Sequence, residues 1–204
     1  MVKIALAYII SFLPLSFMRG WCYRALGYRV AGAYIGWGTV IAVDHAELVG
    51  CRIGRMNRFV GPMKVSIKRG AQIGNGNKFA CGQWSAKGGY ARRLDIGENC
   101  LITGDHYFDV AGSFSLGNQS WIGGVRSQFW THGPGSYERD IRIGERCYIG
   151  SGVMFAPGSS VGDNTIVALG SVVTKPFQDR DVMLAGQPAK IVRENYDWKA
   201  KRRA

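Results

Sequence analysis

The sequence predicts an all-β fold, a parallel β-helix in which the chain turns a corner every six residues. Apolar residues recur at an unbroken spacing of six in the C-terminal half, at Ile143, Ile149, Phe155, Val161, Val167 and Val173. Most of them precede a glycine or an alanine, which leaves room for a bend. Neither the 3.6-residue period of a helix nor the alternation of an ordinary strand produces this spacing. A solenoid of short strands, each pointing one apolar side chain into a narrow core, does produce it.

The same spacing extends towards the N-terminus with interruptions. Its earlier members are Ile35, Ile41, Ile53, Phe59 and Val65, then Ile67, Ile73 and Phe79, then Ile96, Ile102 and Phe108, then Val110, Leu116 and Ile122. Glu47 breaks the first block, and a slip of two residues separates Val65 from Ile67. The residue two positions before each member is usually small, and strand residues i and i+2 share a face. Residues 29–176 are therefore predicted to form one β-helix with three short strands in each coil.

The two ends of the chain are expected to cap the solenoid, because its repeats bury apolar surface only against neighbouring repeats. Residues 1–28 hold an apolar run that is short for a membrane-spanning helix and is interrupted by Pro14. Aromatic and cationic residues follow, a mixture typical of a membrane interface. Two hypotheses stay open for this short helical segment: it covers the open end of the solenoid or a sister subunit, or residues 1–29 rest on the inner face of the cytoplasmic membrane. Residues 177–204 form a C-terminal extension with a basic tail.

The charge and the cysteines narrow the class of protein. The formal net charge of +12 suggests an anionic partner, but the chain has no nucleic-acid-binding motif, so anionic lipid or a phosphorylated cofactor is expected instead. Cys51, Cys100 and Cys147 fall at the small interior positions, and no cysteine belongs to a CxxC pair. They are expected to be core residues in a reducing, cytoplasmic compartment, with no metal.

His132 is the first candidate for chemistry. It stands where the six-residue spacing fails between Ile122 and Ile143, in a stretch of Pro, Gly, Ser and charged residues. A loop from about residue 133 to 140 is predicted to leave the solenoid here. Loops on a rigid scaffold commonly carry functional residues.

The segments around this loop resemble the hexapeptide-repeat acyltransferases, and among them the maltose/galactoside O-acetyltransferase and polysaccharide-modifying branches. The resemblance rests on Thr131-His132, on Ile143 to Gly152, on Pro157 to Asn164, and on the closing stretches Gly170-Ser-Val-Val-Thr-Lys175 and Ala185-Gly-Gln-Pro-Ala-Lys-Ile-Val-Arg193. It implies a left-handed coil, a homotrimer with active sites between subunits, and direct transfer from acetyl-CoA to a hydroxyl or amine. The implied acceptor is a sugar hydroxyl of a cell-envelope polysaccharide or its lipid-linked precursor.

The same resemblance implies roles for individual residues. His132 is expected to be the general base, since a neutral imidazole suits proton removal near neutral pH. Backbone N–H groups at Gly150 and Ser151 are expected to bind the oxyanion. The implied cofactor-binding residues are Tyr148, Gly150, Ser151, Leu169, Gly170, Thr174, Lys175 and Arg193. The implied acceptor-binding residues, one coil earlier and beside the loop, are Asp109, His106 and Trp130.

Alternatives remain at this level. N-acetylation of an amino sugar is nearly indistinguishable from O-acetylation. A γ-carbonic-anhydrase-like metalloenzyme is less favoured, because His45, His106 and His132 are far apart in the sequence. A solenoid without catalysis is less favoured because of the Thr-His loop and the closing Thr-Lys segment.

Overall fold

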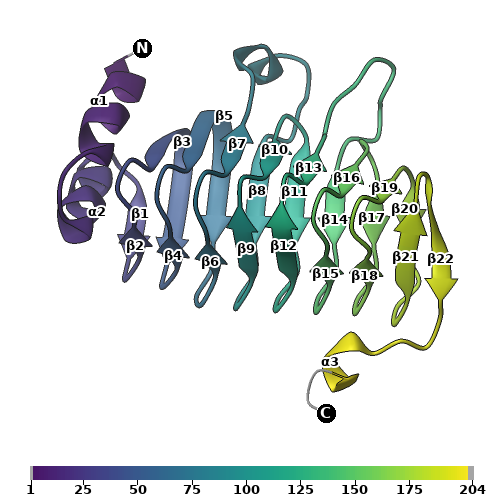
Figure 1. Ribbon diagram of the computed structural model, residues 1–204. Helices are drawn as coiled ribbons and strands as arrows, with labels where there is room; N and C mark the ends of the chain where they lie inside the picture. Colours follow the sequence, from purple (N-terminus) through teal and green to yellow (C-terminus); the bar gives the residue numbers. More distant parts are fainter. Residues whose placement is uncertain (1, 202–204) are drawn as a thin grey trace.

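The computed structural model describes residues 2–201 and shows a three-sided prism of parallel strands with helices at one end (Figure 1). Helices α1 (Val2–Ser11) and α2 (Ser16–Ala25) precede the first coil. The three sides are called faces A, B and C, and each edge is named by the two faces that meet there. The fold class predicted from the six-residue spacing is confirmed. The end of the basic tail, residues 202–204, lies outside the described residues.

Faces A and B share two long strands, β3 (Val40–Val49) and β5 (Arg58–Ile67), which run around the edge between them. Face A continues with β7 (Lys78–Ala80), β10 (Tyr107–Asp109), β13 (Gln128–Phe129), β16 (Met154–Phe155) and β19 (Val172–Val173). Face B holds β1 (Arg29–Ala31), β8 (Arg93–Ile96), β11 (Ser113–Leu116), β14 (Ile141–Ile143), β17 (Ser160–Val161) and β20 (Pro176–Phe177).

Face C is a separate sheet that ends in the only antiparallel pairing among the described strands. Its strands are β2 (Tyr34–Ile35), β4 (Arg52–Ile53), β6 (Gln72–Ile73), β9 (Leu101–Gly104), β12 (Trp121–Val125), β15 (Tyr148–Ile149), β18 (Ile166–Val167), β21 (Met183–Gly186) and β22 (Ala189–Arg193). The chain then returns to this face as α3 (Trp198–Lys201), where the Trp198 indole N–H donates to the Arg146 carbonyl at 2.6 Å.

The prism interior contains the side chains that the six-residue spacing predicts to be buried. All the repeat members from Ile35 to Val173 are buried, and so are Cys51, Cys100 and Cys147. Inside face A the register stacks five phenylalanine rings, Phe59, Phe79, Phe108, Phe129 and Phe155, at centroid separations of 4.4, 4.4, 4.6 and 5.3 Å. Because one side chain per strand faces a narrow interior, equivalent residues of successive coils must pack on one another.

Two departures from the spacing have structural causes. At Glu47 the register of β3 against β5 shifts near Val43, so that Ala46 and Leu48 become the inward residues and Glu47 faces outward.

The second departure was not predicted. The chain leaves the prism twice, not once, because residues 81–92 form an additional excursion with a 3₁₀ helix at Gln83–Ala86. Both excursions rise from the A/B edge in Figure 1.

The N-terminal helices close the first coil. The Tyr23 hydroxyl donates to the Thr39 carbonyl at 3.0 Å and accepts from the Ile41 N–H at 3.1 Å. The buried Arg19 guanidinium donates to the Ile35 carbonyl at 2.9 Å. The first strands therefore end against a helical cap with their polar groups satisfied. No helix within residues 2–201 is both long enough and apolar enough to span a membrane.

Candidate active site

The A/B edge brings His132 onto Asp109. His132 lies in the excursion of residues 130–140, which connects β13 to β14, and Asp109 ends β10 one coil earlier. The two side chains meet with His132 Nδ1 2.6 Å from Asp109 Oδ2. The same carboxylate oxygen accepts from the Thr131 backbone N–H at 2.9 Å and from the Thr131 hydroxyl at 2.8 Å. Asp109 Oδ2 therefore accepts two hydrogen bonds from Thr131 in addition to its contact with the imidazole.

This geometry fixes the tautomer of His132. The Asp109 side chain is 4% exposed and the His132 side chain 37% exposed. A buried carboxylate at hydrogen-bond distance requires a proton on Nδ1, so Nε2 carries the lone pair on the accessible side of the ring. The arrangement is that of a general base held by an acidic positioning residue.

Aromatic rings surround the exposed part of His132. Trp84, from the excursion of residues 81–92, contacts the imidazole edge-on at a centroid distance of 4.9 Å, and Trp130 lies 6.4 Å away. Trp130 in turn packs on Tyr107 at 4.8 Å. Trp84 is not among the site residues expected from the sequence. The signal that could have found it is the broken spacing between Phe79 and Ile96, which marks the excursion of residues 81–92.

The two excursions support each other across the edge. Tyr90 packs on Trp84 at 5.0 Å, and the Arg139 guanidinium lies 4.1 Å from the Tyr90 ring. Arg92 donates to the Pro62 carbonyl at 3.1 Å and fastens the end of the first excursion to β5. The position of Trp84 over His132 thus depends on both loops.

His106 does not belong to this cluster. Its ring is buried on the prism side of β10, where Nδ1 accepts from the Ser127 N–H at 3.0 Å and Nε2 faces the Thr103 hydroxyl at 3.0 Å. Both ring nitrogens are used by the protein, and no part of the imidazole is presented to an acceptor. The expectation that His106 binds the acceptor is therefore replaced by a structural role.

Acidification is expected to destabilise the fold through His106. Burial lowers the pKa of His106 from 6.5 to about 4, against a smaller opposing effect of Asp105. Between these values the unfolded chain binds a proton that the folded chain rejects, so the free energy of unfolding falls as the pH falls. The His106 contribution approaches about 1.4 kcal/mol per pH unit. Urea titrations from pH 7 to pH 4 measure how the free energy of unfolding depends on pH. The His106→Gln variant keeps every carboxylate of the wild type, so its free energy of unfolding should fall less steeply with pH. Parallel slopes would contradict this assignment.

The predicted cofactor residues lie on two different edges of one protomer. Gly150, Ser151, Leu169 and Gly170 occupy successive corners of the C/A edge, after β15 and β18. Thr174 and Lys175 follow β19 on the A/B edge, the edge that also carries His132. From β13 to β19 is two strand spacings, or about 10 Å along the prism. A single protomer therefore places Lys175 on the edge of His132 but separates both from the glycine corners by the width of face A.

The corners of the C/A edge differ in whether they present a free backbone N–H group or an exposed side chain. The Gly150 N–H donates to the Val167 carbonyl at 2.9 Å, so it is not free to bind an oxyanion. A side chain at Gly150 would meet the backbone of Leu169 at 2.7 Å, which explains the glycine as close packing between coils. The expectation of an oxyanion donor at Gly150 is thus not supported. Leu169 projects from the next corner with 79% of its surface exposed.

Tyr148 and Arg193 contact the C-terminal segment of their own chain. Tyr148 lies on the outside of face C, with its ring 5.5 Å from the ring of Trp198. Arg193, at the end of β22, stacks on Tyr196 at 5.0 Å. These contacts do not test the cofactor role expected of Tyr148 and Arg193, which stays a prediction.

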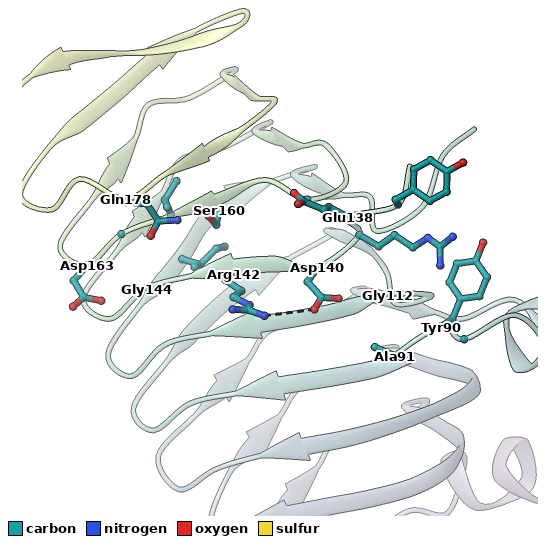
Figure 2. A pocket seen from close by; sticks show the side chains of 17 residues that line it. Tyr90, Ala91, Gly112, Glu138, Asp140, Arg142, Gly144, Ser160, Asp163 and Gln178 are labelled. Carbon is teal, nitrogen blue, oxygen red and sulfur yellow. Dashed lines mark ion pairs between the residues drawn. The ribbon is translucent and has the colours of Figure 1, made fainter. Parts of the chain in front are cut away.

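A pocket lies elsewhere, on face B beneath the excursion of residues 130–140. Figure 2 shows Gln178, Ser160 and Asp163 on the left of the pocket and Tyr90 on the right, with Arg142, Asp140 and Glu138 between them. Its volume is about 730 Å³, and its lining includes none of the site residues expected from the sequence. Both acidic and basic side chains line it, including Asp140 and Arg142, which form an ion pair at 3.7 Å.

The interior cysteines are poor nucleophiles. Burial raises the pKa of Cys51 and that of Cys147 to about 11, and it also raises the pKa of Cys100. A thiolate is the reactive form of cysteine. An acyl-cysteine route through these three residues is therefore disfavoured.

Comparison with known proteins agrees with this fold. Residues 140–175 match the family model described as bacterial transferase hexapeptide (six repeats). Among solved structures, the chain resembles a maltose O-acetyltransferase from Clostridium difficile 630, with a TM-score of 0.51 and 18% identity over 95% of this chain and 84% of that chain. It also resembles the polySia specific acetyltransferase NeuO, with a TM-score of 0.54 and 18% identity over 84% and 82%. The likeness to these solved structures shows the left-handed β-helix fold, and residues 140–175 carry the match to the hexapeptide repeat.

Curated relatives narrow the resemblance within that class. The chain is 41% identical over 104 residues to the galactoside O-acetyltransferase of Escherichia coli (strain K12), a match that covers 51% of this chain and 45% of that protein. It is 30% identical over 120 residues to the putative colanic acid biosynthesis acetyltransferase WcaF of the same strain, covering 55% and 65%. The chain spans about half the length of the first curated relatives it matches. About half of the chain thus resembles acetyltransferases named for galactosides and for colanic acid biosynthesis.

Proposed function

We propose that the protein is an acetyl-CoA-dependent O-acetyltransferase that modifies a sugar hydroxyl of a cell-envelope polysaccharide or of its lipid-linked precursor. The observation that carries the proposal is the pair His132–Asp109 on an exposed edge of a hexapeptide-repeat prism, at 2.6 Å and surrounded by aromatic rings. The resemblance to galactoside and polysaccharide acetyltransferases supports the reaction class.

The mechanism needs one base because the thioester is already activated. His132 Nε2 takes the proton of the acceptor hydroxyl as its oxygen attacks the thioester carbonyl. Asp109 holds the imidazole through Nδ1 and stabilises the imidazolium that forms. The C–S bond breaks as the tetrahedral intermediate collapses, and the departing CoA sulfur takes the proton from the His132 imidazolium, which returns the neutral base. The Ser151 N–H is the remaining candidate for the oxyanion donor.

A second copy of the chain would complete the site. Acetyl-CoA that meets His132 on the A/B edge of one protomer would reach the corners of Ser151, Leu169 and Gly170 only on the C/A edge of a neighbour. Lys175, an exposed cation on the edge of His132, suits a phosphate of the nucleotide. Thr174 lies beside it. This division of residues between edges supports a homotrimer with shared sites.

N-acetylation of an amino sugar is the alternative reaction, since the same base accepts a proton from an ammonium or an amine. A γ-carbonic-anhydrase-like site is disfavoured because both ring nitrogens of His106 are engaged within the prism and cannot join His132 around a metal.

Acetyl transfer to a panel of cell-envelope glycans tests the proposed function. We expect acetyl-CoA turnover with at least one glycan and an O-acetyl ester in the product, located by mass spectrometry and NMR. An amide product would favour the alternative, and release of CoA without an acetylated product from any glycan would reject the proposal.

We further propose that the outer surface of α1 and α2 binds the inner face of the cytoplasmic membrane. The inward residues Ala7 and Tyr23 are fully buried in the cap, whereas Ile9, Phe17 and Trp21 are 65–70% exposed. Helices that cap a prism need only one apolar face, so this second apolar surface requires another explanation. Aromatic and aliphatic side chains with nearby cations are typical of an interfacial membrane contact.

Replacing Phe17 and Trp21 by serine is expected to reduce binding to vesicles that contain phosphatidylglycerol by about tenfold or more, because each side chain contributes roughly 1.5–3 kcal/mol when buried. Deleting the helices is a poorer test, because it uncovers the prism core. Sedimentation with vesicles and thermal unfolding are the measurements. Val192→Ser, an exposed apolar position on β22, is the matched control and should bind as wild type. Equal binding by all three proteins would reject the membrane contact.

A further inference from the structure

The outside of face A carries a continuous column of side chains, one from each coil. The strand register places them next to one another in the order Val40, Arg58, Lys78, Tyr107, Gln128, Met154 and Val172. Successive strands are about 4.8 Å apart. The column therefore starts at the capped end of the prism and passes β10 and β13 on its way to the C-terminal coils (Figure 1).

The middle of this column is continuous with the surroundings of His132. Gln128 Oε1 accepts from the Trp130 indole N–H at 3.1 Å, and Trp130 packs on Tyr107 at 4.8 Å. Trp130 is in turn 6.4 Å from the His132 ring. A molecule that stacks on Tyr107 and Trp130 would thus lie beside the proposed base.

The capped end of the column is cationic. Arg58 and Lys78 are both exposed, and the Lys78 ammonium lies 5.4 Å from the Tyr107 ring. Neither cation takes part in an ion pair among residues 2–200, whose side chains the structure describes. Face B differs, because Arg29 pairs with Glu47 and Arg93 with Asp95 on its outside. The column itself contains no carboxylate, so its two positive charges are uncompensated.

We propose that face A is an extended acceptor subsite for an anionic glycan, with carboxylate or phosphate groups of the chain on Arg58 and Lys78 and sugar rings on Tyr107 and Trp130. The inference rests on the proposed acetyl transfer and adds the class of acceptor to it. Lys78 and Arg58 lie two and three strand spacings from Gln128, about 10 and 14 Å. A free monosaccharide at His132 does not reach the cations, whereas an oligosaccharide of a few rings does.

The binding of three probes tests the subsite. The probes are a neutral malto-oligosaccharide, an oligogalacturonate of equal length, and an oligosaccharide linked to polyprenyl pyrophosphate. The wild type is expected to bind at least one anionic probe more tightly than the neutral one, with an affinity that falls as salt increases. In the double variant Arg58→Ala/Lys78→Ala the anionic-to-neutral affinity ratio should fall about tenfold or more, since hydrogen bonds to charged groups contribute about this factor. Preference for the carboxylate probe or for the pyrophosphate probe identifies the source of the charge.

Arg52→Ala is the matched control, because Arg52 is an exposed arginine in the same coil as Arg58 but on face C. It should keep the wild-type ratio. An unchanged ratio in the double variant, or an equal loss with Arg52→Ala, would overturn the subsite while leaving acetyl transfer intact. Failure of the proposed function is seen separately, as the absence of acetylated product from any acceptor with the wild type.

Discussion

Replacing His132 by alanine is expected to reduce acetyl transfer by about 10²–10⁴-fold, the usual contribution of a general base. The structure gives the physical reason, since the imidazole is oriented by Asp109 and presents Nε2 to the exposed side of the edge. Thermal unfolding should hardly change, because the Asp109 carboxylate keeps its two hydrogen bonds from Thr131. Initial rates of CoA release, acetyl-CoA binding and the unfolding temperature are the three measurements.

Two further variants make the result specific. His45→Ala removes an exposed histidine of β3 and should leave turnover unchanged. Asp109→Asn keeps an oxygen acceptor for Thr131 but removes the negative charge, so kcat should fall while the KM for acetyl-CoA stays near the wild-type value. Turnover of His132→Ala within a few-fold of the wild type would remove this residue from the chemistry. A positioning role for Asp109 would be contradicted by an unchanged kcat.

Replacing Phe108 by alanine is expected to destabilise the fold by about 3–5 kcal/mol, the cost of truncating a fully buried aromatic ring. Phe108 occupies the centre of the phenylalanine stack, 4.4 Å from the Phe79 ring and 4.6 Å from the Phe129 ring, with Phe114 edge-on at 5.0 Å. A narrow three-sided interior offers few ways to collapse into the cavity, because each coil is hydrogen-bonded to the coils on both sides.

Denaturant titration measures this effect, and Phe108→Leu provides a milder variant that should lie between alanine and the wild type. Phe17→Ala is the control, since Phe17 is 70% exposed and its loss should change stability by no more than about 0.5 kcal/mol. A loss below about 1 kcal/mol for Phe108→Ala would mean that the stack contributes far less than its burial indicates.

The sequence by itself determined the prism, because its six-residue period has one physical solution. One apolar residue per strand and a small residue at each bend specify a narrow core and repeated corners, and every repeat member from Ile35 to Val173 is buried as expected. The failure of the spacing before Ile143 correctly located the loop of His132. These are local properties, in which each residue's neighbours along the chain decide where its side chain points.

The tertiary structure alone decided which residues meet at the edges, since that depends on how coils stack. Asp109 and His132 are 23 positions apart, yet the register of β10 on β13 brings them to hydrogen-bond distance. Trp84 reaches His132 from the excursion of residues 81–92, which the spacing marks only as a gap. The His106 ring is buried in the prism and its neighbour Tyr107 faces out, as successive strand residues do. The sequence likewise did not reveal that the expected cofactor residues are divided between two edges. A period of six predicts that corners occur, but it does not predict which corner lies next to another subunit.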